Sequence, residues 1–130
     1  MDFDGIDSVE WHRAFKRDFK KLSKRYRSLR DDLETFIRTS IRAVHVLGQC
    51  PEPLGHFPVQ GLGDDEQEVF IAKKFACRSL KGTGGRSGIR VVYRFEKNTL
   101  HLLLIEIFYK GDKELLDLER IRGIIEKASD

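Results

Sequence analysis

The hydrophobic period of this sequence changes about halfway along the chain, and this change limits the folds open to it. Before residue 48, apolar side chains recur every three or four positions, as they do on one face of an amphipathic helix. Between residues 68 and 109, they alternate with polar side chains or form an apolar run. Helices followed by consecutive strands are typical of an α+β domain, not of alternating βαβ units.

The first half predicts two helices. The apolar stripe of the first comprises Phe15, Phe19, Leu22, Tyr26 and Leu29. A turn at residues 28–32 leads into the second, whose stripe runs from Leu33 to Leu47 and stops at Gly48. We expect the two helices to pack as an antiparallel hairpin, because the turn between them is short. Residues 6–11 can form a short strand before them.

The second half predicts three strands and a last helix. Residues 49–67 hold all three prolines and predict a loop that lies across the body of the domain. Strands follow over residues 68–78, 88–96 and 99–109, with a tight turn at Lys97-Asn98. The last strand is the most apolar, which predicts a central strand covered on both faces. A helix then starts at Gly111-Asp112, with five side chains inward: Leu115, Leu118, Ile121, Ile124 and Ile125.

The predicted order is (β)ααβββα, in one α+β domain over residues 1–130. We expect an antiparallel meander of three strands, with the helical hairpin on one face and the last helix at the C-terminal end. No apolar run reaches the roughly 18 residues of a membrane span. The acidic, polar start does not resemble a secretory signal, so we expect a cytoplasmic protein.

The composition points to an anionic partner and away from a metal. Two cysteines without Cys-x-x-Cys spacing and four scattered histidines predict no metal site, and we expect no cofactor. Residues 69–110 carry nine basic and two acidic side chains, a net charge of +7. Such a concentration of positive charge suits phosphates or an acidic protein, and it does not choose between them.

Three segments resemble the RelE/ParE superfamily of bacterial toxins. Residues 11–25 (WHRAFKRDFKKLSKR) resemble its opening helix, and residues 86–95 (RSGIRVVYRF) its central strand, where Gly-φ-Arg-φ-φ-Tyr recurs. Residues 105–114 (IEIFYKGDKE) resemble its last strand and the turn that follows. The resemblance spans nearly the whole chain.

The resemblance implies the toxin of a type II toxin–antitoxin system. RelE-like members cut mRNA in the ribosomal A site without a metal: a ribose 2′-hydroxyl attacks, and the protein supplies basic side chains. ParE-like members poison DNA gyrase instead. A cognate antitoxin binds and silences both kinds, so we expect a hetero-oligomer with an antitoxin and no membrane partner.

Four basic residues are the expected catalytic set if the chain is an endoribonuclease (mRNA interferase). Arg90 matches the family arginine, and its planar fork can hold two phosphate oxygens. Lys74 and Arg78 lie on the preceding predicted strand, and Lys110 follows the last one. Each also has an ordinary interpretation as a solvated surface residue, and a lysine often protects an edge strand.

Four further basic residues are expected to contact RNA: Lys81, Arg86, Arg94 and Lys113. The segment from Lys81 to Gly88 is glycine-rich but lacks the ending of a phosphate-binding Walker A sequence. It is either a flexible connection or a loop that contacts phosphate through backbone amides. His101 is a candidate base, although a lone histidine on a strand is more often structural.

Two departures from the family keep other functions open. Many RNA-cutting members carry a tyrosine or histidine in their C-terminal segment, whereas this chain has neither after Tyr109, and its loop at residues 81–88 is long. The alternatives are a gyrase inhibitor, a toxin-like binding protein without catalysis, and a general RNA- or DNA-binding module. Tyr93 and Phe95 are expected to face inward, which disfavours base stacking.

Overall fold

The computed structural model describes residues 3–62, 68–113 and 115–128. Five strands and several helices form an α+β fold in the order β1 (Ser8–Trp11), α1 (Arg13–Arg25), α2 (Leu29–Phe36), a π-helix η1 (Ile37–Ile41), α3 (Arg42–His45), a 3-10 helix η2 (Glu52–Leu54), β2 (His56–Pro58), β3 (Val69–Ala72), β4 (Ile89–Glu96), β5 (His101–Tyr109) and α4 (Leu118–Ala128).

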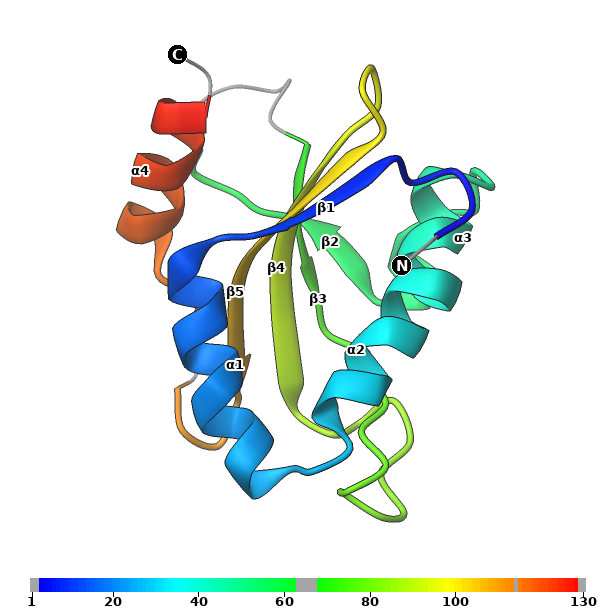
Figure 1. Cartoon of the computed structure of the whole chain (residues 1–130), viewed down its shortest axis with the longest axis vertical. Helices are drawn as coiled ribbons and strands as arrows, with labels where there is room; N and C mark the ends of the chain where they lie inside the picture. The colour runs from blue at the N-terminus through cyan, green and yellow to red at the C-terminus, as the bar shows by residue number, and fades with distance from the viewer. Residues whose placement is uncertain (1–2, 63–67, 114, 129–130) are drawn as a thin grey trace.

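The strands make one mixed sheet in the order β1-β5-β4-β3-β2. β3, β4 and β5 are antiparallel neighbours, as the sequence predicts, whereas β1 pairs parallel to β5 and β2 adds an edge strand beside β3. Figure 1 shows the sheet nearly edge-on, with α4 on one side and α2 and α3 on the other. β4 is therefore the middle strand of the sheet. The prediction that residues 99–109 form the central strand is wrong, because β5 lies beside the middle strand.

Two apolar cores lie on opposite faces of the sheet. The larger core joins α1, α2 and η1 to one face and includes Tyr93 and Phe95, both fully buried. The smaller core joins α4 to the other face and includes Val92 and Phe108. β5 supplies side chains to both, which confirms the prediction of a strand covered on both faces.

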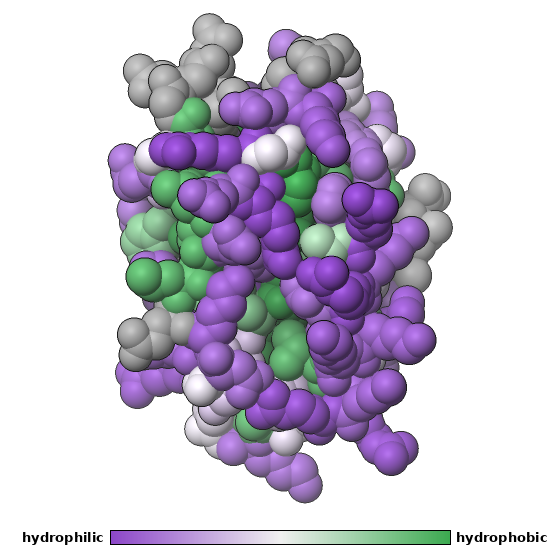
Figure 2. Space-filling model, turned by 90° about the vertical axis from the view of Figure 1, so that its left-hand side faces the viewer, coloured by the Kyte–Doolittle hydropathy of each residue, from purple (hydrophilic) through white to green (hydrophobic). Residues whose placement is uncertain are grey.

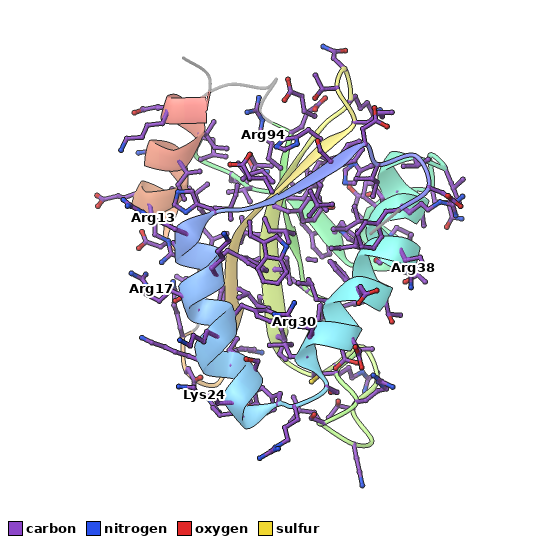
Figure 3. The ribbon with its side chains drawn as sticks, in the orientation of Figure 1. Arg13, Arg17, Lys24, Arg30, Arg38 and Arg94 are labelled. Atoms are coloured by element: carbon purple, nitrogen blue, oxygen red, sulfur yellow. The ribbon has the colours of Figure 1, made fainter. Side chains whose placement is uncertain are left out.

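The two long helices splay apart more than a tight hairpin would. α1 packs along β5, and its contacts with α2 are few. The guanidinium of Arg30 lies between them, 5.8 Å from the Trp11 ring and 5.6 Å from the Phe19 ring, and Figure 3 shows it in the space between the helices. A cation above two aromatic rings fills the gap where a hairpin would place apolar contacts.

The strand predicted over residues 68–78 is shorter, because after Ala72 side chains form hydrogen bonds with its backbone carbonyl oxygens. Arg90 Nη1 donates to the carbonyl oxygen of Lys73 at 2.5 Å, and the Ser87 hydroxyl donates to that of Phe75. The partner edge is also occupied. β2 lies inside the predicted loop and pairs with β3, and Lys73 N donates to Gly55 O. Residues 63–67 of that predicted loop lie outside the described residues.

The last helix starts later than predicted. The carboxylate of Asp117 accepts the backbone N–H of Arg120 at 3.1 Å, so Asp117 and not Asp112 caps the helix. Asp112 instead pairs with Arg25 at 2.5 Å. Leu115 consequently lies before the helix and is 77% exposed, which overturns its predicted inward position. Ile121, Ile124 and Ile125 are buried as predicted.

Within the described residues, no helix combines the length and the apolar character that a membrane crossing requires.

Candidate functional site

Arg90 lies on β4, on the face opposite the larger core. Ile89 and Val91 on either side of it point into that core and are fully buried. Arg90 pairs across the sheet with Phe108, whose ring belongs to the α4 face. Arg90 is therefore a half-buried arginine on the α4 face of the sheet, as its alternation with the apolar residues predicts.

Three lysines lie on segments next to Arg90. Lys73, whose carbonyl oxygen Arg90 contacts, holds its ammonium 5.3 Å from the Phe57 ring. The ammonium of Lys113 lies 5.2 Å from the ring of Phe108, the cross-strand partner of Arg90. Lys110 continues the hydrogen bonding between β4 and β5 by one bond, since its backbone N–H donates to Gly88 O at 2.7 Å. We call Lys73, Arg90, Lys110 and Lys113 the basic sheet surface.

A buried carboxylate anchors the edge of this surface nearest α4. Glu106 is 0% exposed and bonds Arg120 Nη2 at 2.8 Å and Lys113 Nζ at 3.3 Å. It also accepts the backbone N–H of Asp117 at 3.2 Å. Arg120 in turn reaches Asp18 of α1 at 3.1 Å. This network ties α4, β5 and α1 together and offsets part of the charge of Lys113.

Figure 2 shows the side of the molecule that carries α4. Hydrophilic side chains cover most of its right-hand half, where α1 lies, and hydrophobic atoms are visible toward the left and in the lower centre. On the sheet itself, exposed cations beside the half-buried Phe57 ring suit a polyanion, because phosphates bind such cations.

Lys74 and Arg78 do not lie on the basic sheet surface. Both line a groove of about 640 Å³ between α2, η1 and the segment after β3. Lys74 Nζ donates to Pro53 O at 2.9 Å, and Arg78 bonds Asp32 at 3.1 Å and Asp31 at 3.4 Å. The expectation that they share one site with Arg90 and Lys110 does not fit this arrangement.

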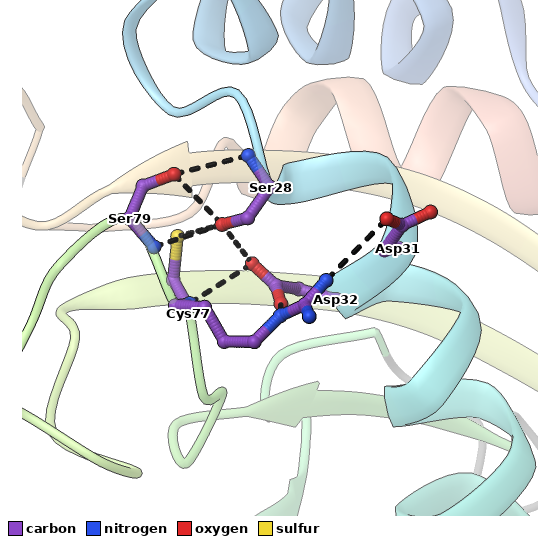
Figure 4. Close-up of polar contacts among 6 residues, drawn as sticks. Ser28, Asp31, Asp32, Cys77 and Ser79 are labelled. Atoms are coloured by element: carbon purple, nitrogen blue, oxygen red, sulfur yellow. Dashed lines mark hydrogen bonds and ion pairs between the residues drawn. The ribbon is translucent and has the colours of Figure 1, made fainter.

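Arg78 belongs to a polar cluster that fixes the segment after β3 to the start of α2 (Figure 4). The buried carboxylate of Asp32 accepts the Ser28 hydroxyl at 2.6 Å and the Arg78 backbone N–H at 3.1 Å. The Ser79 backbone N–H donates to Ser28 Oγ at 2.8 Å. Burial raises the pKa of the nearby Cys77 thiol, so the thiol stays protonated. These contacts give Arg78 a structural role.

The remaining predicted RNA contacts are dispersed. Lys81 and Arg86 are exposed on the loop between β3 and β4, which Figure 1 places below α2. Arg94 lies at the other end of the sheet, in a cavity of about 370 Å³ that His12 and Lys127 also line. Its position near the top of the sheet is visible in Figure 3, away from Arg17 and Lys24, which point outward from α1. Only Lys113 of this group joins Arg90.

His101 lies at the far end of the β4–β5 hairpin from Arg90. Its Nδ1 shares a hydrogen bond with Ser8 at 2.6 Å, and its Nε2 with Glu10 at 3.0 Å. Both contacts join β1 to β5, so His101 holds the edge strand in place. Its position does not bring it to the basic sheet surface.

Sequence reasoning missed Lys73 and chose Lys74. The available signal was Ile71, which is two residues before Lys73 and on the same face of a strand. Lys74 shares a face with Phe70 and Ala72, and the structure turns that face toward the larger core. A second omission is a hydrogen-bonded chain through Ser40, His56, Tyr93 and His45, whose members are too far apart in sequence to form a motif.

No cluster of three or more His, Cys, Asp or Glu side chains that could hold a metal ion occurs among the residues that the structure describes.

Comparison with known proteins leaves the family open. No family model and no curated protein matches this sequence. Among solved structures, the chain is similar to the toxin–antitoxin complex RelBE2 from Mycobacterium tuberculosis, at 18% identity and a TM-score of 0.45, over 81% of this chain and 92% of that chain. An assignment of function therefore depends on the residues and the surface described above.

Proposed function

We propose that this protein is the toxin of a type II toxin–antitoxin pair and cuts mRNA on the ribosome through the basic sheet surface. The observation that carries the proposal is the position of Arg90 on the middle strand, beside Lys73, Lys110 and Lys113. The sequence of that strand, Gly88-Ile89-Arg90-Val91-Val92-Tyr93, is the sharpest part of the resemblance to RelE-like toxins.

The chemistry requires charge stabilisation more than any covalent step on the protein. When a ribose 2′-hydroxyl attacks the adjacent phosphate, negative charge grows on the phosphate oxygens. Arg90 can bind two of those oxygens at once, while a lysine can bind the leaving oxygen or give it a proton. One preorganised contact of this kind is worth about 3 kcal/mol, or about a hundredfold in rate.

An antitoxin that silences the protein would bind this same surface. An acidic segment that also carries apolar side chains would neutralise Lys73, Arg90 and Lys110 and cover the half-buried Phe57 ring. The proposal therefore includes an antitoxin as partner, and it places toxin and antitoxin in a hetero-oligomer in the cytoplasm.

Inhibition of DNA gyrase without RNA cleavage is the second candidate. It is favoured by the side chains that define the surface, which include no histidine and no tyrosine to act as a general base. The neighbouring carboxylate of Glu106 is buried and bound by Arg120 and Lys113. A binding protein needs only the cations and the half-buried Phe57 ring.

The test is to induce the protein alone in bacteria and to map RNA 5′ ends and DNA breaks. New cuts inside translated codons would support the nuclease. Growth arrest with intact mRNA and gyrase-trapped breaks would support the second candidate, and no arrest would contradict both. Arg90→Ala should lose the arrest, and Lys20→Ala, on the exposed face of α1, is the matched control that should keep it.

A further inference from the structure

A chain of four hydrogen-bonded side chains crosses the larger core, and the proposed function does not use it. Ser40 Oγ lies 2.6 Å from His56 Nε2, and His56 Nδ1 lies 2.7 Å from the Tyr93 hydroxyl. That hydroxyl lies 2.7 Å from His45 Nε2. His56 and Tyr93 are both 0% exposed, so the middle of the chain is sealed from water.

Local structure brings Ser40 to His56. The helix widens to a π-helix over Ile37–Ile41, and such wide turns often occur at functional sites. Ser40 does not bond back to its own helix as its neighbour does, since Thr39 Oγ1 donates to Thr35 O at 2.7 Å. The His56 ring is held in turn by stacking on Phe36, with 5.6 Å between the ring centroids.

The order of the contacts matches that of an activated nucleophile, its base and the group that orients the base. Burial lowers the pKa of His56 to about 4, so its imidazole is neutral at pH 7 and its unprotonated nitrogen can accept the hydrogen bond of the Ser40 hydroxyl. If Ser40 donates to His56 Nε2, then His56 Nδ1–H donates to the Tyr93 oxygen, and Tyr93 donates to His45. Every member then has a partner.

Ser40 is accessible from one side. It is half-buried and lines the groove of about 640 Å³ that also contains Lys74. Among the cations of this groove, Arg38 pairs with Glu34 and Arg78 with Asp31 and Asp32. Lys74 bonds only the Pro53 carbonyl oxygen among the described residues, which leaves two of its three N–H donors for a substrate oxygen.

We propose that Ser40 and His56 form a nucleophile–base pair that hydrolyses small carboxylic esters in this groove. Ser40 Oγ attacks the ester carbonyl carbon while its proton passes to His56 Nε2. The bond to the leaving alcohol breaks, and His56 returns the proton to that alcohol. Water then attacks the acyl-serine by the same route, which releases the acid and restores Ser40.

The experiment uses the full chain, p-nitrophenyl acetate as substrate, and a fluorophosphonate probe that bonds to an activated serine with loss of fluoride. The expected result is a label on Ser40 and ester hydrolysis that falls at least about a hundredfold in Ser40→Ala. Thr39→Ala removes a hydroxyl one residue away that bonds Thr35 O of its own helix, and it should keep both signals.

Tyr93→Phe retains the ring but removes the hydroxyl that orients His56, so it should reduce hydrolysis more than it reduces folding, as checked by circular dichroism. A label on another residue, or equal hydrolysis by the wild type and Ser40→Ala, would overturn the proposal. Growth arrest separates this site from the basic sheet surface, because Ser40→Ala should still arrest growth if the proposed toxin function holds.

Discussion

The polar side chains on the two faces of the sheet differ in burial and bonding, although β4 supplies a polar side chain to each face. On the α2 side, β4 contributes Tyr93, which is fully buried and bonded to His45 and His56. On the α4 side, the same strand contributes Arg90, whose neighbours Lys73 and Lys110 are exposed. Polar groups with complete internal bonding stabilise one arrangement of the core, whereas exposed cations remain available to a partner.

The sharpest test of this difference substitutes two residues of β4. Phe95→Ala empties a fully buried site of the larger core and should lower the free energy of unfolding by about 3–5 kcal/mol. Arg90→Ala removes one hydrogen bond to a carbonyl and should cost only about 1 kcal/mol. Urea denaturation measures both, and an equal loss would contradict the division between the two faces.

The buried ion network should give the next largest effect. Glu106→Gln leaves Arg120 and Lys113 without their buried carboxylate and should lower the free energy of unfolding by about 3 kcal/mol, less what the Asp18 contact retains. Glu126→Gln, on the exposed side of α4, is the control. If both variants unfold at the same urea concentration, the network does not anchor α4.

Acid should lower the free energy of unfolding through the two buried histidines on the α2 side of the sheet. Burial lowers the pKa of His45 and His56 to about 4, so at lower pH the unfolded chain binds protons that the folded chain excludes. This stability is fully present above pH 6.5 and is lost as the pH falls toward 4. The loss at pH 5 should be about 2 kcal/mol for His56, and smaller for the half-buried His45. His56→Gln should flatten the profile, and an unchanged slope would contradict this assignment.

The smallest effect concerns the start of α4. Asp117→Ala removes the cap that accepts the Arg120 N–H and should cost about 1 kcal/mol. Asp112→Ala removes an exposed ion pair with Arg25 and should cost less, because solvent screens it. If Asp112→Ala lowered stability more than Asp117→Ala, the result would indicate that Asp112 caps the helix.

Regular alternation made part of this fold predictable. β4 lies within one residue of its predicted bounds, and Ile89, Tyr93 and Phe95 are buried as their period of two indicates. The failures occur where a side chain replaces a backbone partner. Arg90 ends the β3 ladder at Lys73, and Asp117 delays α4. Neither contact can be recognised from the residues next to it in the sequence.

The candidate sites divide in the same way. Arg90 and Lys113 were accessible to sequence reasoning, because a strand motif and its following turn placed them. Lys74 was preferred to Lys73 on the expectation that Ile71 and Phe75 face one core, whereas Phe75 lies in the larger core and Ile71 packs against the smaller one. The chain from Ser40 to His45 depends on a π-helix and on pairs separated by 16, 37 and 48 residues, which one sequence does not reveal.

The central claim is that the basic sheet surface is where this protein acts. The most direct measurement compares growth arrest and RNA 5′ ends for two triple variants that remove the same charge. One replaces Lys73, Arg90 and Lys110 by glutamine, and the other replaces Lys16, Lys20 and Lys24, which are exposed on α1. We predict that the first loses arrest and cleavage while the second keeps both. Loss in the α1 variant alone, or full activity in the first, would contradict the claim.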